Sequence, residues 1–427
     1  MKKTLALLLV LVLLSGNVCL TYAQETAKEA QRFGVTVPDA FVPQGGSIVV
    51  SSRTGQILWE EDAQTSWVPS SITKLMVIYL TFRAMDQGSF GLDTPVTITR
   101  EIAELSTYFY ISNNKMIEGQ TYTVAELFEL IFLQSSSAAT MALVWQMGYD
   151  HGQFVSLMNQ TAKDLGMRET IYHNAVGATN AAMGNYPAAG QPLEDQNYTT
   201  ALDTAILVSH LVEEYPEILQ HSSILQKTFK PGTAAEETFE SLLKTLEGSD
   251  YSFEGADGLK TGSGGASGYN LSMTAKRGDT RMVGILFGVG DWYDYEQPIY
   301  RSSMINGIME KSFEAYEYRL ILPKGEIQLD GRRLQTSEDL YDIVLKGQTP
   351  TLRLVGDQIQ LNLERSYLPG YSAPGVRFVD LEELAAQEQA AAKAKRDDFK
   401  DKVSPIVVVL MFIGMLGWSA VQTPKKP

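Results

Sequence analysis

Two apolar segments, one at each end of the chain, confine the part that can fold in water to the residues between them. At the amino end, Lys2 and Lys3 precede an apolar run at 5–14, and small and polar residues follow up to Ala23. This order is typical of a secretory signal peptide cleaved after Ala23, because the run is shorter than the ~20 residues of a membrane helix. A retained amino-terminal anchor is the alternative. We predict a signal peptide over 1–23 and an exported mature chain.

At the other end, residues 403–421 are apolar apart from two serines. The segment has the length and character of a membrane-spanning helix and predicts a transmembrane anchor, with a cytoplasmic tail over 422–427. The stretch before it carries more positive charge than the tail, against the positive-inside preference, but export by a signal peptide would set the orientation. A helix lying in the membrane interface is the alternative, although the segment lacks the polar face that such a helix needs.

Charge and cysteine content exclude several classes of function. The 427 residues include 35 Lys and Arg against 50 Asp and Glu, a net charge of −15, and no long basic run, so no nucleic-acid partner is expected. Cys19 is the single cysteine, which excludes a disulfide framework and a multi-cysteine metal site. His210 and Glu214 lie four residues apart without a third ligand nearby, and we interpret them as a surface pair. No metal or cofactor is predicted.

The hydrophobic pattern between the two ends predicts a mixed domain followed by a small β domain. Helices are predicted at 72–85, 124–147, 151–165, 200–214 and 298–316. Strands are predicted at 47–51, 56–59, 269–276 and 280–289. This order predicts an α/β (α+β) domain over 24–320, with a central antiparallel sheet flanked by helices.

Beyond residue 320 the chain changes to short alternating segments separated by Asp-Gly and Gly-Asp turns. These segments, at 327–329, 351–354 and 359–363, predict a small all-β domain over 321–380. The following stretch over 381–402 is rich in Ala, Glu, Gln and Lys, and it predicts a helical stalk leading to the membrane helix.

Ser71 and Lys74 form the first candidate catalytic pair. The sequence Ser71-Ile72-Thr73-Lys74 lies where a loop meets a buried helix, so both side chains lie on one face of its first turn. A lysine amine beside a hydroxyl can accept its proton if burial or a neighbouring cation lowers the lysine pKa. The pattern alone has little specificity, because about two such matches are expected by chance. A second match, at 241–244, lies in an acidic amphipathic stretch and is interpreted as chance.

Two further polar clusters accompany this pair. Ser135-Ser136-Ser137 connects two predicted buried helices, although a helix N-cap has the same appearance. Lys260-Thr261-Gly262 precedes Ser263 and a glycine-rich stretch, and it is expected by chance only about one time in ten. A strand edge bearing Lys and Thr, with a Gly that lets substrate approach the backbone, is suited to binding a carboxylate.

In this order the three clusters resemble the Ser-x-x-Lys, Ser-x-Asn and Lys-Thr-Gly motifs of penicillin-binding proteins and serine β-lactamases. Flanking residues, such as Pro69-Ser-Ser-Ile-Thr-Lys74 and Asp257-Gly-Leu-Lys-Thr-Gly262, resemble the low-molecular-mass penicillin-binding proteins that are D-alanyl-D-alanine carboxypeptidases. The resemblance covers roughly residues 40–320. It implies a penicillin-binding-protein/β-lactamase-like transpeptidase domain, and the β domain and the membrane anchor also match the architecture of that family.

The resemblance further implies an acyl-enzyme mechanism on peptidoglycan stem peptides, in an enzyme that faces the wall from a bacterial plasma membrane. Ser71 would attack the D-Ala-D-Ala carbonyl with Lys74 as general base. Ser135 would relay a proton to the departing D-alanine, and water would hydrolyse the acyl-enzyme. β-Lactam antibiotics would acylate Ser71 as substrate mimics.

The same resemblance assigns the substrate-binding residues. Lys260 would supply positive potential, Thr261 would bind the terminal carboxylate, and Gly262 would let the substrate approach. The backbone N–H groups of Ser263 and of the nucleophile would form the oxyanion hole. Ser137 stands where the family has asparagine, and because serine lacks the amide donor we expect reduced or retuned turnover.

Two alternatives stay open. Ser137 is compatible with a catalytically weak relative that binds wall peptides or scaffolds a cell-wall complex. A β-lactamase is the other, but no Glu-x-x-x-Asn element lies between the second and third clusters, and that activity requires neither the β domain nor the anchor.

Overall fold

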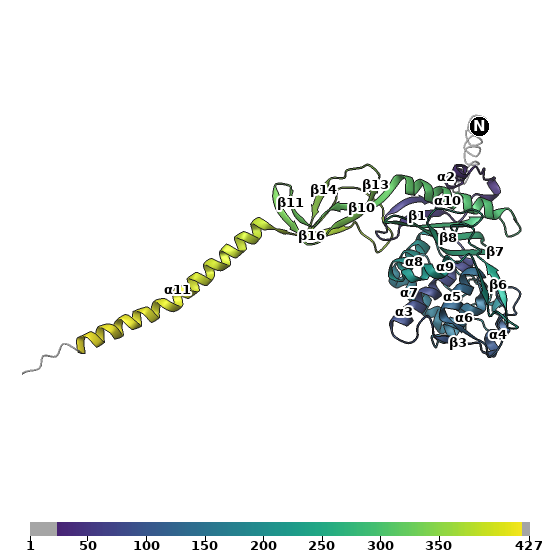
Figure 1. Cartoon of the computed structure of the whole chain (residues 1–427), viewed down its shortest axis with the longest axis horizontal. Coiled ribbons are helices and arrows are strands. Elements are labelled where there is room, and N and C mark those ends of the chain that lie inside the picture. Colours follow the sequence, from purple (N-terminus) through teal and green to yellow (C-terminus); the bar gives the residue numbers. More distant parts are fainter. Residues whose placement is uncertain (1–23, 421–427) are drawn as a thin grey trace, which may run out of the picture. The chain divides into compact units, whose positions relative to one another are not determined.

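The structure, a computed structural model, describes residues 24–420. The predicted signal peptide and the predicted tail lie outside the described residues. Two compact units make up the chain (Figure 1). Of the described residues, the first unit contains 24–319, 342–349 and 364–373, and the second contains 320–341, 350–363 and 374–420. The predicted boundary at residue 320 does not separate out the segments 342–349 and 364–373, which belong to the first unit. An alternating sequence pattern predicts a strand but does not show which unit the strand packs in.

A five-stranded antiparallel sheet lies at the centre of the first unit, with the strand order β2-β1-β9-β8-β7. Its strands are β1 (Ser47–Ser51), β2 (Ile57–Glu61), β7 (Ala256–Gly264), β8 (Gly268–Arg277) and β9 (Thr280–Val289). The early hairpin joins the late strands through β1 and β9, where Ile48 lies opposite Ile285. The helices between β2 and β7 are thus inserted into one sheet, and β7 forms its edge.

Both faces of this sheet are buried, so the side chains of β9 alternate between two cores. Val283, Ile285 and Phe287 pack toward the inserted helices. Met282 and Leu286 pack on the other face, under α10 (Gln297–Ala315). Figure 1 shows α10 on one side of the sheet and the inserted helices on the other. Each such side chain contributes about 1.5–3 kcal/mol by burial. Because both of its faces are covered, β9 is almost continuously apolar from Met282 to Val289.

The inserted part is mainly helical. Its elements are η3 (Ser70–Thr73), α3 (Lys74–Asp86), α4 (Arg100–Leu105), α5 (Val124–Leu133), α6 (Ser137–Gln146), α7 (His151–Leu165), η4 (Ala181–Met183), α8 (Ala201–Glu214), η5 (Pro216–Ile218) and α9 (Leu219–Ser222). The short strands β3 (Pro95–Thr97) and β4 (Thr121–Thr123) pair with each other, as do β5 (Gln226–Phe229) and β6 (Glu237–Glu240). The elements α2 (Gln24–Glu29), η1 (Ala30–Phe33) and η2 (Asp39–Phe41) precede the sheet.

Local sequence signals explain where these helices begin. Thr200 caps α8, because its hydroxyl accepts a hydrogen bond from the Asp203 N–H at 3.0 Å. The helical stretch predicted at 124–147 is divided into α5 and α6. Ser135 adopts a left-handed φ of 59°, which ends one helix, and the Ser136 hydroxyl then caps the next.

The second unit contains an antiparallel sheet with the order β11-β12-β16-β15-β14. Its strands are β11 (Gly325–Leu329), β12 (Arg332–Thr336), β14 (Leu352–Val355), β15 (Gln358–Leu361) and β16 (Gly375–Asp380). One face buries Leu334, Ile359 and Val376 in a small core. β10 (Tyr316–Leu322) and β13 (Leu340–Leu345) pair as a separate two-stranded sheet.

α11 (Leu381–Ala420) contains the predicted stalk and nearly all of the predicted anchor. Within the described residues, no helix combines the length and the apolar character that crossing a membrane requires. The anchor predicted at 403–421 is therefore not confirmed, and its last residue lies outside the described part of the chain.

Candidate active site

The structure brings Ser71 and Lys74 together at the junction of η3 and α3. Ser71 is partly exposed, whereas Lys74 begins α3 and is only 1% exposed. The Lys74 Nζ lies 2.8 Å from the Ser71 Oγ and 2.9 Å from the Val176 carbonyl oxygen. Ser71 is thus partly open to solvent, while the amine beside its hydroxyl is held away from water.

The second and third clusters meet at a hydrogen bond. The Lys260 Nζ donates to the Ser135 Oγ at 3.0 Å and to the Thr261 carbonyl oxygen at 2.8 Å. Ser135 and Lys260 are both buried, and Ser135 is held in a left-handed conformation that serine rarely adopts. Strained backbone of this kind persists only where surrounding contacts enforce it, and it is often found at functional sites.

The three serines of the second cluster make different hydrogen bonds. The Ser136 hydroxyl accepts a hydrogen bond from the Ala139 N–H at 3.1 Å, so the N-cap interpretation holds for this residue. Ser137 is the buried first residue of α6, and its N–H donates to the Ser112 carbonyl oxygen at 2.8 Å. Within the described residues, Ser135 is therefore the serine of this cluster that is hydrogen-bonded to the third cluster.

An asparagine from another loop lies beside Ser137 without replacing the missing amide. The Asn113 Oδ1 accepts from the Ala138 N–H at 2.9 Å, and its Nδ2 donates to the Leu105 carbonyl oxygen at 2.9 Å. Both ends of this amide are therefore engaged by backbone.

Gly262 brings the third cluster against the nucleophile. A Cβ at this position would lie 2.6 Å from the Pro69 carbonyl oxygen and 3.1 Å from the Ile72 nitrogen, so only glycine allows β7 to run this close to η3. Thr261 is buried and Ser263 is exposed. Since β7 is the edge of the sheet, one row of its backbone groups faces away from β8 and can pair with a bound peptide.

Burial controls the charge of the two lysines. Desolvation, and then the positive charge of Lys260, lower the pKa of Lys74 well below its ordinary value. Burial, and then the positive charge of Arg301, lower the pKa of Lys260 to about 7. Lys74 is therefore held beside the Ser71 hydroxyl in surroundings that disfavour its charged form, which suits a proton acceptor.

Arg301 is a charged residue near the site that sequence reasoning missed. It lies in α10, is 5% exposed, and donates through Nη1 to the Asn270 carbonyl oxygen at 3.3 Å. Its Nε has no hydrogen-bond partner among the described residues, and burial lowers its pKa to about 10. The available signal was helical spacing, which places Arg301 on the same face as the buried Ile305 and Ile308.

A loop distant in sequence holds the carbonyl that contacts Lys74. The Asn174 Oδ1 accepts from the N–H groups of Val176 and Gly177 at 3.1 and 2.7 Å. The Asn197 Nδ2 donates to the Asn174 carbonyl oxygen at 3.0 Å and to the Thr73 hydroxyl at 2.9 Å. These side chains join the loop to η3, and no local motif in the sequence predicts the connection.

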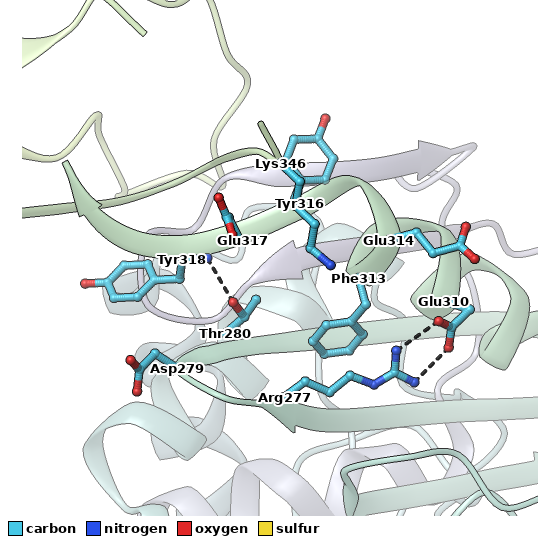
Figure 2. A pocket seen from close by; sticks show the side chains of 10 residues that line it. All are labelled: Arg277, Asp279, Thr280, Glu310, Phe313, Glu314, Tyr316, Glu317, Tyr318 and Lys346. Carbon is cyan, nitrogen blue, oxygen red and sulfur yellow. Dashed lines mark hydrogen bonds and ion pairs between the residues drawn. The ribbon is translucent and has the colours of Figure 1, made fainter. Parts of the chain in front are cut away.

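A polar pocket of about 340 Å³ lies away from the three clusters, between the β8–β9 turn and the end of α10. Figure 2 shows its Arg277 side chain pointing to Glu310. The two guanidinium–carboxylate hydrogen bonds measure 2.9 and 2.7 Å, so the central charges of this pocket already satisfy each other. None of the residues predicted to carry chemistry lines it.

No group of three or more His, Cys, Asp and Glu able to hold a metal ion is found within residues 24–420. The predicted surface pair is present, with the His210 Nδ1 2.6 Å from a Glu214 carboxylate oxygen.

A family model described as D-alanyl-D-alanine carboxypeptidase matches residues 35–290, a span that includes all three clusters. The chain belongs to this family. A second model, described as a domain of unknown function (DUF1958), matches residues 318–378. The predicted family is therefore confirmed, and the later β strands have a match of their own.

Two relatives illustrate the extent of the similarity. D-alanyl-D-alanine carboxypeptidase DacF of Bacillus subtilis is 23% identical over 317 residues, which are 74% of this chain and 72% of the relative. DacC of Escherichia coli is 27% identical over 278 residues, which are 65% of this chain and 63% of the relative.

Solved structures share the fold. A peptidoglycan synthesis regulatory factor (PBP3) from Streptococcus pneumoniae is similar with a TM-score of 0.67 at 24% identity, over 81% of this chain and 99% of that one. Penicillin-binding protein D2 from Listeria monocytogenes in the cefotaxime-bound form has a TM-score of 0.51 at 25% identity, over 65% and 100%. The predicted transpeptidase-like domain and all-β domain are confirmed at this level.

Replacing Gly177 by alanine tests how closely the loop holds the nucleophile. Gly177 has a φ of 83°, and a Cβ there would lie 1.8 Å from the Ser70 carbonyl oxygen. We expect Gly177→Ala to lower the Tm and to slow acylation of Ser71 by a labelled penicillin, because Ser70 must move.

Gly190→Ala is the matched control, since Gly190 has a φ of 79° and nothing within 4 Å of its Cβ position. It carries only the left-handed backbone cost of about 1–2 kcal/mol and should acylate at the wild-type rate. Equal acylation rates in the two variants would contradict a positioning role for the loop.

Proposed function

We propose that this family member is a serine-type carboxypeptidase that removes the terminal D-alanine from peptidoglycan stem pentapeptides through an acyl-enzyme on Ser71. The observation that carries the proposal is the buried amine of Lys74, 2.8 Å from the Ser71 hydroxyl. Burial lowers the pKa of this amine and so favours its neutral form, which can accept a proton.

In acylation, Lys74 accepts the Ser71 proton while the Ser71 oxygen bonds to the carbonyl carbon of the penultimate residue. The N–H groups of Ser71 and Ser263 bind the resulting oxyanion. The intermediate then collapses, the C–N bond breaks, and the proton passes from Lys74 through Ser135 to the departing amine. Water then attacks the ester carbonyl with Lys74 again as base. The bond between the acyl carbon and the Ser71 oxygen breaks, Lys74 returns the proton to that oxygen, and the shortened peptide is released.

We assign the substrate carboxylate to the part of the site formed by Lys260 and Thr261. Lys260 and Arg301 supply the positive potential from the buried side, and the Thr261 hydroxyl donates a hydrogen bond at the strand edge. The position of Lys260 beside Ser135 links this clamp to the proton path, since the two side chains are 3.0 Å apart.

β-Lactam inhibition and the location at the wall are parts of the same proposal. The cefotaxime-bound relative supports acylation of Ser71 by β-lactams. The apolar segments at 5–14 and 403–421 support export and anchoring at a bacterial plasma membrane with the site on the outside.

A weakly catalytic relative that binds wall peptides is the second candidate. Ser137 favours it, because this residue lacks the amide of the family motif and the neighbouring Asn113 amide is already engaged. Slow labelling by penicillin together with no release of D-alanine from a pentapeptide would favour this candidate.

Ser71→Ala tests the nucleophile, and Ser241→Ala is its control because Ser241 and Lys244 form the other Ser-x-x-Lys match. We expect Ser71→Ala to abolish penicillin labelling and to reduce D-alanine release by at least about a thousandfold. Ser241→Ala should behave as wild type, since the Ser241 hydroxyl only accepts from the Leu243 N–H at 3.1 Å. Full activity in Ser71→Ala would contradict the mechanism.

The pH dependence of acylation tests the division of charge between the two lysines. The second-order rate of penicillin acylation should fall at acid pH, as Lys74 becomes protonated, and again at alkaline pH, as Lys260 loses its charge with a pKa of about 7 in the free enzyme. In Lys260→Arg the alkaline decline should disappear, because arginine keeps its proton. An unchanged alkaline decline in this variant would show that Lys260 does not cause it.

A further inference from the structure

The residue before the nucleophile combines a strained backbone with a buried hydroxyl. Ser70 adopts a left-handed φ of 48° and is only 5% exposed. Serine rarely adopts this conformation, which persists only where surrounding contacts enforce it. Two contacts hold Ser70 in this way, one at its carbonyl group and one at its hydroxyl group.

The carbonyl group of Ser70 packs against the loop at 173–177. A Cβ on Gly177 would lie 1.8 Å from the Ser70 carbonyl oxygen, so this oxygen faces the bare backbone of Gly177. In a trans peptide the C=O group and the following N–H group point in opposite directions. The Ser71 N–H therefore points away from this loop, and the peptide plane between Ser70 and Ser71 sets its direction.

The hydroxyl group of Ser70 is joined to the turn between β7 and β8. The Ser70 Oγ lies 2.8 Å from the Ser267 Oγ, and Ser267 is fully buried. The Ser267 hydroxyl also donates to the Gly268 carbonyl oxygen at 3.0 Å. Because a hydroxyl has a single proton, the Ser70 hydroxyl can donate to the Ser267 oxygen while the Ser267 proton is used within the turn.

This hydroxyl pair joins the two segments that carry the proposed oxyanion-hole N–H groups. Ser70 directly precedes Ser71, and Gly264 directly follows Ser263. A Cβ on Gly264 would lie 3.2 Å from the Ser70 Oγ, so the two segments run close together at this point. Two N–H groups stabilise an oxyanion only when both are aimed at one position about 2.7–3.1 Å away. Their relative placement therefore matters more than the presence of either group.

We propose that Ser70 and Ser267 are positioning residues that set the separation and direction of the two oxyanion-hole N–H groups, those of Ser71 and Ser263. The inference rests on the proposed acyl-enzyme mechanism. Because both hydroxyls are buried, they act through the backbone beside them and not by contact with the substrate.

The turn keeps other attachments when either hydroxyl is removed. The Trp67 Nε1 donates to the Ser267 carbonyl oxygen at 3.0 Å, and the Asn270 Nδ2 donates to the Val68 carbonyl oxygen at 2.9 Å. Both bonds connect the β7–β8 hairpin to the loop before Ser70 without using either hydroxyl. Alanine variants at positions 70 and 267 should therefore fold.

The test compares penicillin acylation of the full-length wild type with that of Ser70→Ala, Ser267→Ala and the double variant. We expect Ser267→Ala to be acylated about tenfold more slowly, less than the ~10²–10³ lost with a whole oxyanion-hole donor. Ser70→Ala should lose less, because the Ser267 hydroxyl keeps the Gly268 carbonyl as acceptor. The double variant should be no slower than Ser267→Ala, since the two hydroxyls act as one unit.

A second readout separates oxyanion stabilisation from a general loss of structure. Each protein is also acylated by a D-alanyl ester and by the matching thionoester, in which sulfur replaces the carbonyl oxygen. Sulfur is the weaker hydrogen-bond acceptor, so the preference for the oxygen ester measures the use of the oxyanion hole. This oxygen-to-sulfur rate ratio should fall in Ser267→Ala, whereas a merely structural defect would slow both esters equally.

Ser47→Ala is the matched control. Ser47 is also fully buried, and its hydroxyl lies 2.6 Å from the Thr26 hydroxyl, but β1 is separated from β7 by two strands of the sheet. This variant should lower the Tm while keeping the wild-type acylation rate and the wild-type oxygen-to-sulfur ratio.

Wild-type acylation rates in Ser70→Ala and Ser267→Ala, an unchanged oxygen-to-sulfur ratio, or additive losses in the double variant would overturn the positioning role. D-alanine release by wild type would then leave the carboxypeptidase proposal standing. If wild type is acylated by penicillin and the variants behave as expected but wild type releases no D-alanine from a pentapeptide, the carboxypeptidase proposal fails and the positioning role stands. No acylation of wild type would overturn both.

Discussion

The proximity of two buried lysines is the constraint on which the proposed chemistry depends. Lys74 and Lys260 are each 1% exposed, and each makes hydrogen bonds to a serine hydroxyl and a backbone carbonyl. Keeping both charged in a poorly solvated site would be costly, so one must lose its proton. The arrangement thus produces a base beside the nucleophile and leaves positive potential beside the expected position of the substrate carboxylate.

The fold creates this proximity by inserting helices between strands of one sheet. Lys74 begins a helix of the insertion, whereas Lys260 belongs to the edge strand that follows it. Gly262 and Gly177 allow the strand and the loop at 173–177 to approach η3 from two sides, because a Cβ at either position would clash with backbone there. Positions far apart in sequence therefore set the place of Ser71 jointly.

Much of this could be predicted from sequence where the signal is local. Apolar periodicity marked α3, α7 and α8, and the composition of three short motifs indicated Ser71, Ser135 and Lys260. Features that depend on tertiary contacts were missed or wrong. The serine cluster at 135–137 was predicted to connect two helices, but the left-handed backbone of Ser135 was not predicted. The support of Lys74 by Asn174 and Asn197 from a distant loop was also missed. In the second unit, β12 and β16 were missed because Arg332 and Asp380 stand at positions of the same parity as the core residues and interrupt the apolar alternation.

The charge of Lys74 in the free enzyme is the central claim, and a titration of its amine tests it most directly. The Nζ resonance of Lys74 in protein labelled with ¹⁵N-lysine can be assigned by its loss in Lys74→Met and followed with pH. The account predicts a midpoint well below the ordinary lysine value of about 10.4 and an upward shift when Lys260 is replaced by methionine, since one repelling charge is removed. A midpoint equal to that of the exposed lysines, unchanged by the Lys260→Met substitution, would contradict it.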